Sequence, residues 1–181
     1  MNHALVLIDI QNDYFPGGRM TLVGAEAAGR AAAGLLERFR AAGLPVVHVR
    51  HESVQPAAAF FLPGTPGAEI HPCVAPAAGE PVVRKFFPNA FRDTGLAELL
   101  RGLGAARLTF CGMMTHMCVD TSVRAAFDLG FDCRLAADAC ATLDLPWNGR
   151  SVAAADVQAA YLAALGAVFA RVAPAAELDL P

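Results

Sequence analysis

Cys118 is the residue whose type and position best suit nucleophilic chemistry. It follows an apolar, β-branched segment at 107–111, typical of a buried strand, and precedes apolar residues at helical spacing that end at Gly130. Thr115 is a suitable cap for that helix, which would leave Cys118 in or beside its first turn. The free N–H groups and the dipole there are expected to favour the thiolate, the form that attacks. The alternative is a buried, inert thiol, which is common for free cysteine.

A carboxylate and an amine occupy comparable places on two other segments. Asp9 follows the continuous apolar segment 4–8, and Lys85 ends a short strand that begins at Val82. Parallel strands direct their carboxyl ends to one crevice, so both side chains are expected near the thiol. A carboxylate that takes the thiol proton and a cation that orients the carboxylate would complete an activated nucleophile. In the alternative interpretation, Asp9 caps a turn and Lys85 is a solvated charge. Asp13, in a polar turn, is expected to be solvated.

Strands and helices alternate along the chain, which predicts an α/β fold. The expected architecture is a three-layer α-β-α arrangement with a six-stranded, mostly parallel, Rossmann-like sheet, and residues 1–181 are expected to form a single domain. The expected strands lie at 4–8, 45–49, 82–85, 107–111, 131–136 and 167–172, and the expected helices at 25–42, 94–103, 115–129 and 148–165, the last capped by Asn148.

The segment 50–81 is rich in proline and lacks regular patterns, as in functional loops. Its apolar cluster Phe60, Phe61 and Leu62 is expected to form a pocket wall or a subunit contact. The chain is therefore expected to form a homo-oligomer, a dimer or tetramer.

Charge and composition exclude several classes of function. A formal net charge of −3 gives no reason to expect a nucleic acid or an acidic membrane as partner. No apolar run reaches the roughly 18 residues of a membrane span, and the N-terminus enters a strand without the features of a signal peptide. The chain has 5 cysteines and no CxxC pair, which favours a reducing, cytoplasmic location without disulfides.

Three motifs, in this order, make the sequence resemble the isochorismatase-like cysteine hydrolases, which include nicotinamidases, N-carbamoylsarcosine amidases and ureidoacrylate hydrolases. They are VLIDIQNDYF at 6–15, VRKFFPNAF at 83–91 and GMMTHMCVDTSVRAAFDLGF at 112–131. The resemblance covers nearly the whole chain. It implies an Asp–Lys–Cys triad at Asp9, Lys85 and Cys118.

The resemblance also implies roles for the residues around the triad. The oxyanion hole would consist of backbone N–H groups of Met114 or Thr115 and of Cys118. A non-proline cis peptide would join Met114 and Thr115. Gln11 would support the site.

The metal site of nicotinamidases is not expected in this chain. Those relatives carry an Asp-x-His pair after the second strand, whereas Arg50 stands here in place of the Asp, beside His51. His71 is a possible distal partner, but a cation beside the site opposes a divalent metal. No metal and no cofactor are therefore predicted.

The leading hypothesis is an enzyme that hydrolyses a C–N bond of a small amide, ureido or imide substrate through a thioester. One alternative is vinyl-ether hydrolysis of isochorismate, which in the family does not use the Cys as nucleophile. Another is a non-catalytic Rossmann-like binding domain, although the GxGxxG of dinucleotide sites is absent. The sequence does not identify the substrate or the roles of His116 and Trp147. The expected substrate contacts are Gln11, Phe15, Arg50, His51 and Phe86.

Overall fold

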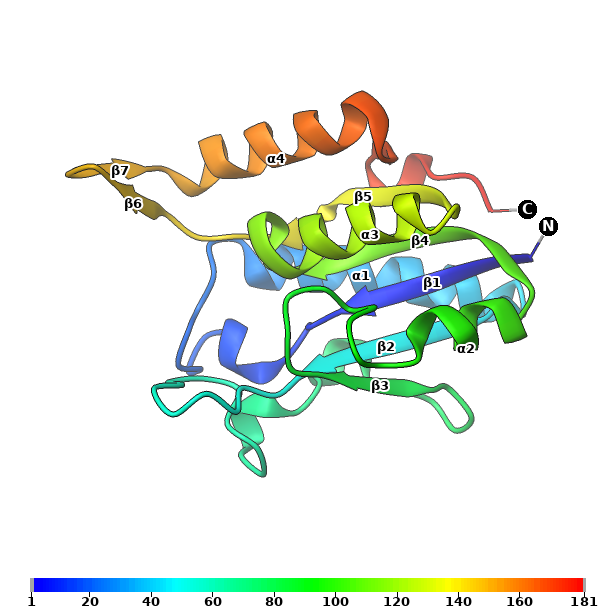
Figure 1. The fold of residues 1–181 in the computed structure, drawn as a ribbon, viewed down its shortest axis with the longest axis horizontal. Coiled ribbons are helices and arrows are strands. Elements are labelled where there is room, and N and C mark those ends of the chain that lie inside the picture. Colours follow the sequence, from blue (N-terminus) through cyan, green and yellow to red (C-terminus); the bar gives the residue numbers. More distant parts are fainter. Residues whose placement is uncertain (1, 181) are drawn as a thin grey trace.

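The computed structural model describes residues 2–180, and its centre is a six-stranded sheet in the order β3-β2-β1-β4-β5-β8 (Figure 1). Every neighbouring pair in this sheet is parallel. The predicted three-layer α/β fold is confirmed, and the sheet is wholly rather than mostly parallel. The strands are β1 Asn2–Ile8, β2 Val46–His51, β3 Val82–Lys85, β4 Ala105–Met113, β5 Asp132–Ala141 and β8 Arg171–Ala173.

Alternate residues of the buried strands supply two separate apolar cores. In β1, Leu5 and Leu7 pack with helix α1 on one face, whereas Val6 and Ile8 pack on the other. Helices α2, α3 and α4 all contribute to that second core, so the sheet is covered on both sides. The helices are α1 Ala25–Ala41, α2 Leu96–Gly102, α3 Asp120–Asp128 and α4 Ala154–Val168.

A β-hairpin replaces the predicted start of the last helix. Strands β6 (Leu145–Trp147) and β7 (Arg150–Val152) pair antiparallel and extend beyond the sheet (Figure 1). Asn148 and Gly149 both have positive φ, 47° and 74°, as a two-residue hairpin turn requires. The prediction that Asn148 caps a helix is therefore wrong. The helix begins at Ala154, whose N–H donates to Asp144 Oδ1 at 2.7 Å.

The proline-rich segment between β2 and β3 is irregular, as predicted, apart from short 3₁₀ turns at Pro66–Ala68 and Pro72–Val74. Its apolar cluster is not a free surface, because Phe61 is buried and Phe60 lines a cavity. Of the two roles predicted for this cluster, a pocket wall or a subunit contact, Phe60 fits the pocket wall. A homo-oligomer stays a prediction, to be checked by sedimentation at micromolar concentration. Large exposed apolar side chains lie elsewhere, at Val23, Trp147 and Val168.

None of the helices in residues 2–180 has the length and apolar character needed to cross a lipid bilayer.

A buried histidine on β1 gives the fold a pH-dependent stability. His3 lies between β4, where its Nε2 is 2.7 Å from Thr109 Oγ1, and the edge-on ring of Phe39 on α1. Its Nδ1 has no partner within residues 2–180. Burial, with some help from Arg107, lowers the pKa of His3 to about 4.

We expect the free energy of unfolding to fall as the pH falls from 6.5 towards 4, because in this range the unfolded chain binds a proton at His3 that the folded chain excludes. Above pH 6.5 the folded state keeps the full stabilisation that comes from excluding this proton. Between pH 6.5 and 4 the free energy of unfolding falls by at most about 1.4 kcal/mol per pH unit because of His3. Urea unfolding of wild type and His3→Gln at pH 7 and pH 5 tests this. The variant should show the shallower pH dependence, and equal slopes would contradict the assignment.

Candidate active site

The carboxyl ends of three strands bring the predicted catalytic side chains together. Asp9 follows β1, Lys85 ends β3, and Cys118 follows β4 in the π-helical turn Thr115–Val119. Lys85 Nζ lies 2.6 Å from Asp9 Oδ2 and 3.2 Å from Cys118 Sγ. All three side chains are buried, and Asp9 and Lys85 have no exposed surface. The structure therefore assembles a thiol, a carboxylate and an amine in one water-poor site.

Asp9 is held in an unusual backbone conformation. Its φ is 50°, which few residues other than glycine adopt, and its N–H donates to Val49 O at 3.0 Å. Such conformations persist where the surroundings enforce them, and they cluster at functional sites. Apart from the ion pair with Lys85, neither carboxylate oxygen has a hydrogen-bond partner within the described chain. The carboxylate is thus free to accept a proton from a neighbouring group.

Lys85 is surrounded by acceptors. Besides Asp9 and Cys118, its Nζ lies 2.9 Å from His51 Nδ1 and 3.1 Å from the Phe87 carbonyl oxygen. Burial by itself would lower the pKa of Lys85, but the negative charge of Asp9 at 2.6 Å outweighs the burial and raises the pKa. Lys85 is therefore an ammonium, and all of these contacts are donated by it.

His51 is a member of the site that the sequence indicated only as a pocket group. It is the last residue of β2 and pairs in register with Lys85 on β3. Because the ammonium can only donate, His51 Nδ1 must accept, and the ring carries its proton on Nε2. Burial, together with the nearby charge of Lys85, lowers the pKa of His51, so the ring is neutral at physiological pH.

Cys118 is not shifted toward thiolate in the resting site, contrary to the prediction. Burial, followed by the charge of Asp9, raises the pKa of the thiol above its ordinary value. Thr115 also does not cap the helix: its hydroxyl lies 2.7 Å from Gln158 Oε1 and 3.2 Å from the Ala141 carbonyl. Dry surroundings and an adjacent carboxylate thus outweigh the helix terminus, and the resting nucleophile is a thiol.

Gly112 allows β4 to approach β1 where the site is built. It pairs with Ile8 at φ 136°, and a Cβ atom on Gly112 would lie 2.0 Å from the Ile8 carbonyl oxygen. Any side chain here would separate Asp9 from the Cys118 turn. A cis peptide follows, joining Met113 and Met114, one residue earlier than the predicted Met114–Thr115 bond. β4 runs on to Met113, past its predicted end at residue 111.

Cys118 and His51 open onto a cavity of about 230 Å³. Of the predicted substrate contacts, His51 and Phe86 line it. The sequence argument missed most of the wall, since the distant segments that form it converge only in the folded chain. The remaining lining residues are Tyr14, Gln55, Phe60, Phe87, Pro88, Met114 and Met117.

Gln11, Phe15 and Arg50 have other contacts. The buried Gln11 side chain bonds the backbone of His51 and Ala68, so it fixes the ends of β2 and of the loop. Arg50 makes ion pairs with Glu52 at 2.7 Å and Glu69 at 2.9 Å.

Phe15 stacks on His71 at 3.6 Å between ring centroids, in a different cleft. None of Gln11, Phe15 and Arg50 lines the cavity at Cys118. Their expected role as direct contacts is therefore wrong for this cavity.

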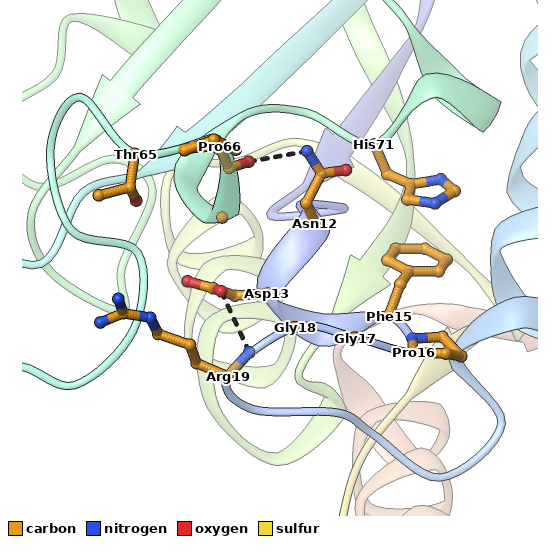
Figure 2. A pocket seen from close by; sticks show the side chains of 11 residues that line it. Asn12, Asp13, Phe15, Pro16, Gly17, Gly18, Arg19, Thr65, Pro66 and His71 are labelled. Carbon is orange, nitrogen blue, oxygen red and sulfur yellow. Dashed lines mark hydrogen bonds between the residues drawn. The ribbon is translucent and has the colours of Figure 1, made fainter.

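Figure 2 shows this second cleft, of about 420 Å³, between the turns after β1 and the proline-rich segment. Its buried acid, Asp13, accepts the N–H groups of Phe61 at 2.6 Å and Arg19 at 3.1 Å, so the prediction of a solvated carboxylate is wrong. A Cβ on Gly67 would lie 2.2 Å from Asp13 Oδ1, which explains the glycine there. Asp13 thus holds together the loops that carry Phe60 and Tyr14.

His116 and His71 are outside the reaction centre. His116 Nδ1 lies 2.6 Å from Thr142 Oγ1, and its ring packs edge-on to Tyr161. Within residues 2–180 the side chains that form a metal-ligating cluster are Asp9, His51 and Cys118, with ligand atoms within 4.8 Å of one another. The Lys85 ammonium contacts all of them, so a divalent cation would have to displace it.

Comparison with known proteins places the chain in a family. Residues 3–177 match the isochorismatase domain. The isochorismatase family protein YddQ of Bacillus subtilis is 46% identical over 172 residues, 95% of this chain and 96% of YddQ. Maleamate amidohydrolase of Pseudomonas putida is 34% identical over 142 residues, 71% of this chain and 67% of that enzyme.

A crystal structure of an isochorismatase hydrolase from Oleispira antarctica superimposes with a TM-score of 0.94 at 54% identity, covering 97% of this chain and 95% of that one. The chain belongs to the isochorismatase family of hydrolases.

Proposed function

We propose that the protein is a cysteine hydrolase that cleaves a C–N bond of a small amide, ureido or imide substrate through a thioester. The observation that carries this proposal is the buried contact of Lys85 with both Asp9 and Cys118, at 2.6 and 3.2 Å, beside a cavity of substrate size. A carboxylate base, an orienting cation and a thiol are the parts of an activated nucleophile. Relatives named as amidohydrolases support the choice of a C–N bond.

In the first step, Asp9 accepts the Cys118 thiol proton as Sγ attacks the substrate carbonyl carbon. The raised pKa of the thiol makes this transfer necessary, because almost no thiolate is present beforehand. The Lys85 ammonium has only three protons for its four neighbouring acceptors, and one N–H can turn from a neutral acceptor toward Sγ as charge develops there. Lys85 thus stabilises Asp9 before the transfer and the sulfur during it.

The carbonyl oxygen becomes an oxyanion that needs donors. The Met114 carbonyl accepts the N–H groups of Met117 at 3.1 Å and Val119 at 3.2 Å, which fixes the turn on either side of Cys118. We assign the backbone N–H groups of Cys118 and of Met114 or Thr115 as the oxyanion donors. Such a donor contributes about 3–4 kcal/mol to the transition state.

Collapse of the tetrahedral intermediate breaks the C–N bond. Asp9 returns its proton to the nitrogen, which leaves as ammonia or an amine, and the acyl group stays on Sγ as a thioester. A water molecule, deprotonated by Asp9, then attacks the thioester carbonyl. The products are a carboxylic acid and the regenerated thiol, with Asp9 again ionised beside Lys85.

Replacing the nucleophile or its base should abolish turnover to a similar extent. We expect Cys118→Ala and Asp9→Asn each to lower kcat by roughly 10⁴-fold or more, and the double variant to lose little beyond either single variant, because the residues act as one unit. The measurement is ammonia release from a panel of small amides and ureas. Mass spectrometry of the quenched wild-type enzyme should show the acyl mass on the Cys118 peptide.

Cys73→Ala is the matched control, since Cys73 is a partly exposed thiol outside this cavity. It should retain both activity and the acyl adduct. Full turnover by Cys118→Ala would refute the covalent mechanism and favour hydrolysis without a thioester, as in the vinyl-ether reaction.

Activity should not depend on a metal ion. Lys85 already supplies the positive charge at the centre of the Asp9, His51 and Cys118 cluster. Arg50 forms ion pairs with glutamates instead of leaving room for a cation. We expect turnover to survive prolonged dialysis against a chelator. Loss of activity together with one metal equivalent per chain, and its return when that metal is added back, would contradict this.

A further inference from the structure

We propose that the cavity beside Cys118 selects an uncharged amide with an apolar acyl group and rejects substrates whose acyl group carries a carboxylate. The inference rests on the proposed function for its reaction, but it concerns the chemistry of the cavity itself. It runs against the resemblance to maleamate amidohydrolase, whose named substrate bears a carboxylate.

The cavity wall is dominated by apolar surface. Aromatic rings and methionine side chains, supplied by loops that follow β1, β2, β3 and β4, surround the sulfur. The volume of about 230 Å³ suits a small planar acyl group more than an extended chain. The apolar lining residues are Phe60, Phe86, Phe87, Pro88, Met114 and Met117.

The cations near this wall are already neutralised. Lys85 has no exposed surface and is bound to Asp9. Arg84 is 60% exposed at its side chain, lies 5.3 Å from the Phe86 ring centroid and pairs with Glu52 at 3.5 Å. None of Lys85, Arg84 and Arg50 lines the cavity.

Phe87 also packs against an arginine that lies outside the cavity. Arg92 lies 3.6 Å above its ring centroid and 3.6 Å from Asp93 Oδ2. Both arginines therefore pack against aromatic residues of the wall but are not among the groups that line the cavity. A carboxylate inside would lose its water without gaining a counter-charge, which strongly disfavours its binding.

The polar side chains of the cavity wall, Tyr14, Gln55 and His51, are uncharged and suit a neutral substrate. The neutral His51 ring, with Nδ1 bound to Lys85, presents its Nε2–H as a hydrogen-bond donor. Uncharged donors of this kind suit a carbonyl or ether oxygen, whereas a carboxylate calls for a bidentate or cationic partner. Polar recognition thus comes from uncharged groups set in an apolar, largely aromatic wall.

Two alkylating reagents of nearly equal size test the cavity without requiring a known substrate. Iodoacetamide is neutral and iodoacetate is anionic, and both form a thioether with displacement of iodide. We divide the rate of alkylation by iodoacetamide by the rate of alkylation by iodoacetate at each cysteine. This ratio should be about tenfold or more higher at Cys118 than at Cys73 of the same chain. Cys73 lies outside the cavity, so it corrects for the net charge of the protein.

Peptide mapping by mass spectrometry assigns each modification. Equal ratios at the two cysteines, or a preference of Cys118 for iodoacetate, would overturn the proposal. Alkylation at Cys118 requires Asp9 to take the thiol proton, so failure of both reagents there would overturn the proposal together with the mechanism on which it rests.

A designed charge provides the matched test. Gln55 lines the cavity from an exposed loop position, so Gln55→Arg adds a cation at the entrance, while Gln55→Met has similar length and no charge. The arginine variant should lower the iodoacetamide preference at Cys118 severalfold, and the methionine variant should not. No difference between the two variants would count against a missing counter-charge as the cause of selectivity.

Substrates give the final comparison. Isocrotonamide and maleamate differ only by a methyl group in place of a carboxylate on the same cis double bond. We expect ammonia release from isocrotonamide with at least about tenfold higher kcat/KM. Preference for maleamate with a Cys118 adduct would overturn the selectivity and leave the cysteine mechanism intact. Turnover of isocrotonamide by Cys118→Ala would instead overturn the mechanism.

Discussion

The buried ion pair between Asp9 and Lys85 is the interaction on which the site depends. Neither side chain has exposed surface, and their atoms are 2.6 Å apart. Removing one partner would leave an unpaired charge in the protein interior, which typically costs about 3–5 kcal/mol. The charges are tolerated because they meet at the carboxyl ends of parallel strands, where the Phe87 carbonyl and His51 provide further acceptors for Lys85. The same pair then presents a carboxylate whose remaining contacts are available for the thiol proton.

Local sequence features predicted the sheet and the three central residues well. Continuous apolar segments such as 4–8 belong to strands buried on both faces, and a side chain that follows such a strand has little freedom of position. The strand ends therefore predicted that Asp9, Lys85 and Cys118 lie near one another, whereas the resemblance to the family supplied their roles as a triad. The helix signals were weaker: Asn148 suits a helix cap as well as a hairpin turn, and the hairpin with Gly149 prevailed.

The electrostatics and the cavity wall were not predictable in this way. The prediction of a Cys118 thiolate considered the helix terminus but not burial or the adjacent Asp9 carboxylate. Burial and this carboxylate together raise the pKa of the thiol. Arg50 appeared suited to contact the substrate until its partners Glu52 and Glu69 were known. Gln55 and Met117 reach the cavity through tertiary contacts that no local pattern encodes. Such contacts depend on the whole fold.

The strand order leaves Lys85 on a strand that can open before the rest of the protein unfolds. Lys85 is supplied by β3, which spans Val82–Lys85 and lies at the edge of the sheet, paired only with β2. An edge strand opens with a smaller free energy than the strands at the centre, where β1 and β4 hold Asp9 and the Cys118 turn. Fraying of β3 would remove the cation while the rest of the molecule stays folded. Amide exchange of residues 82–85, compared with that of β1, would show whether inactivation precedes global unfolding or coincides with it.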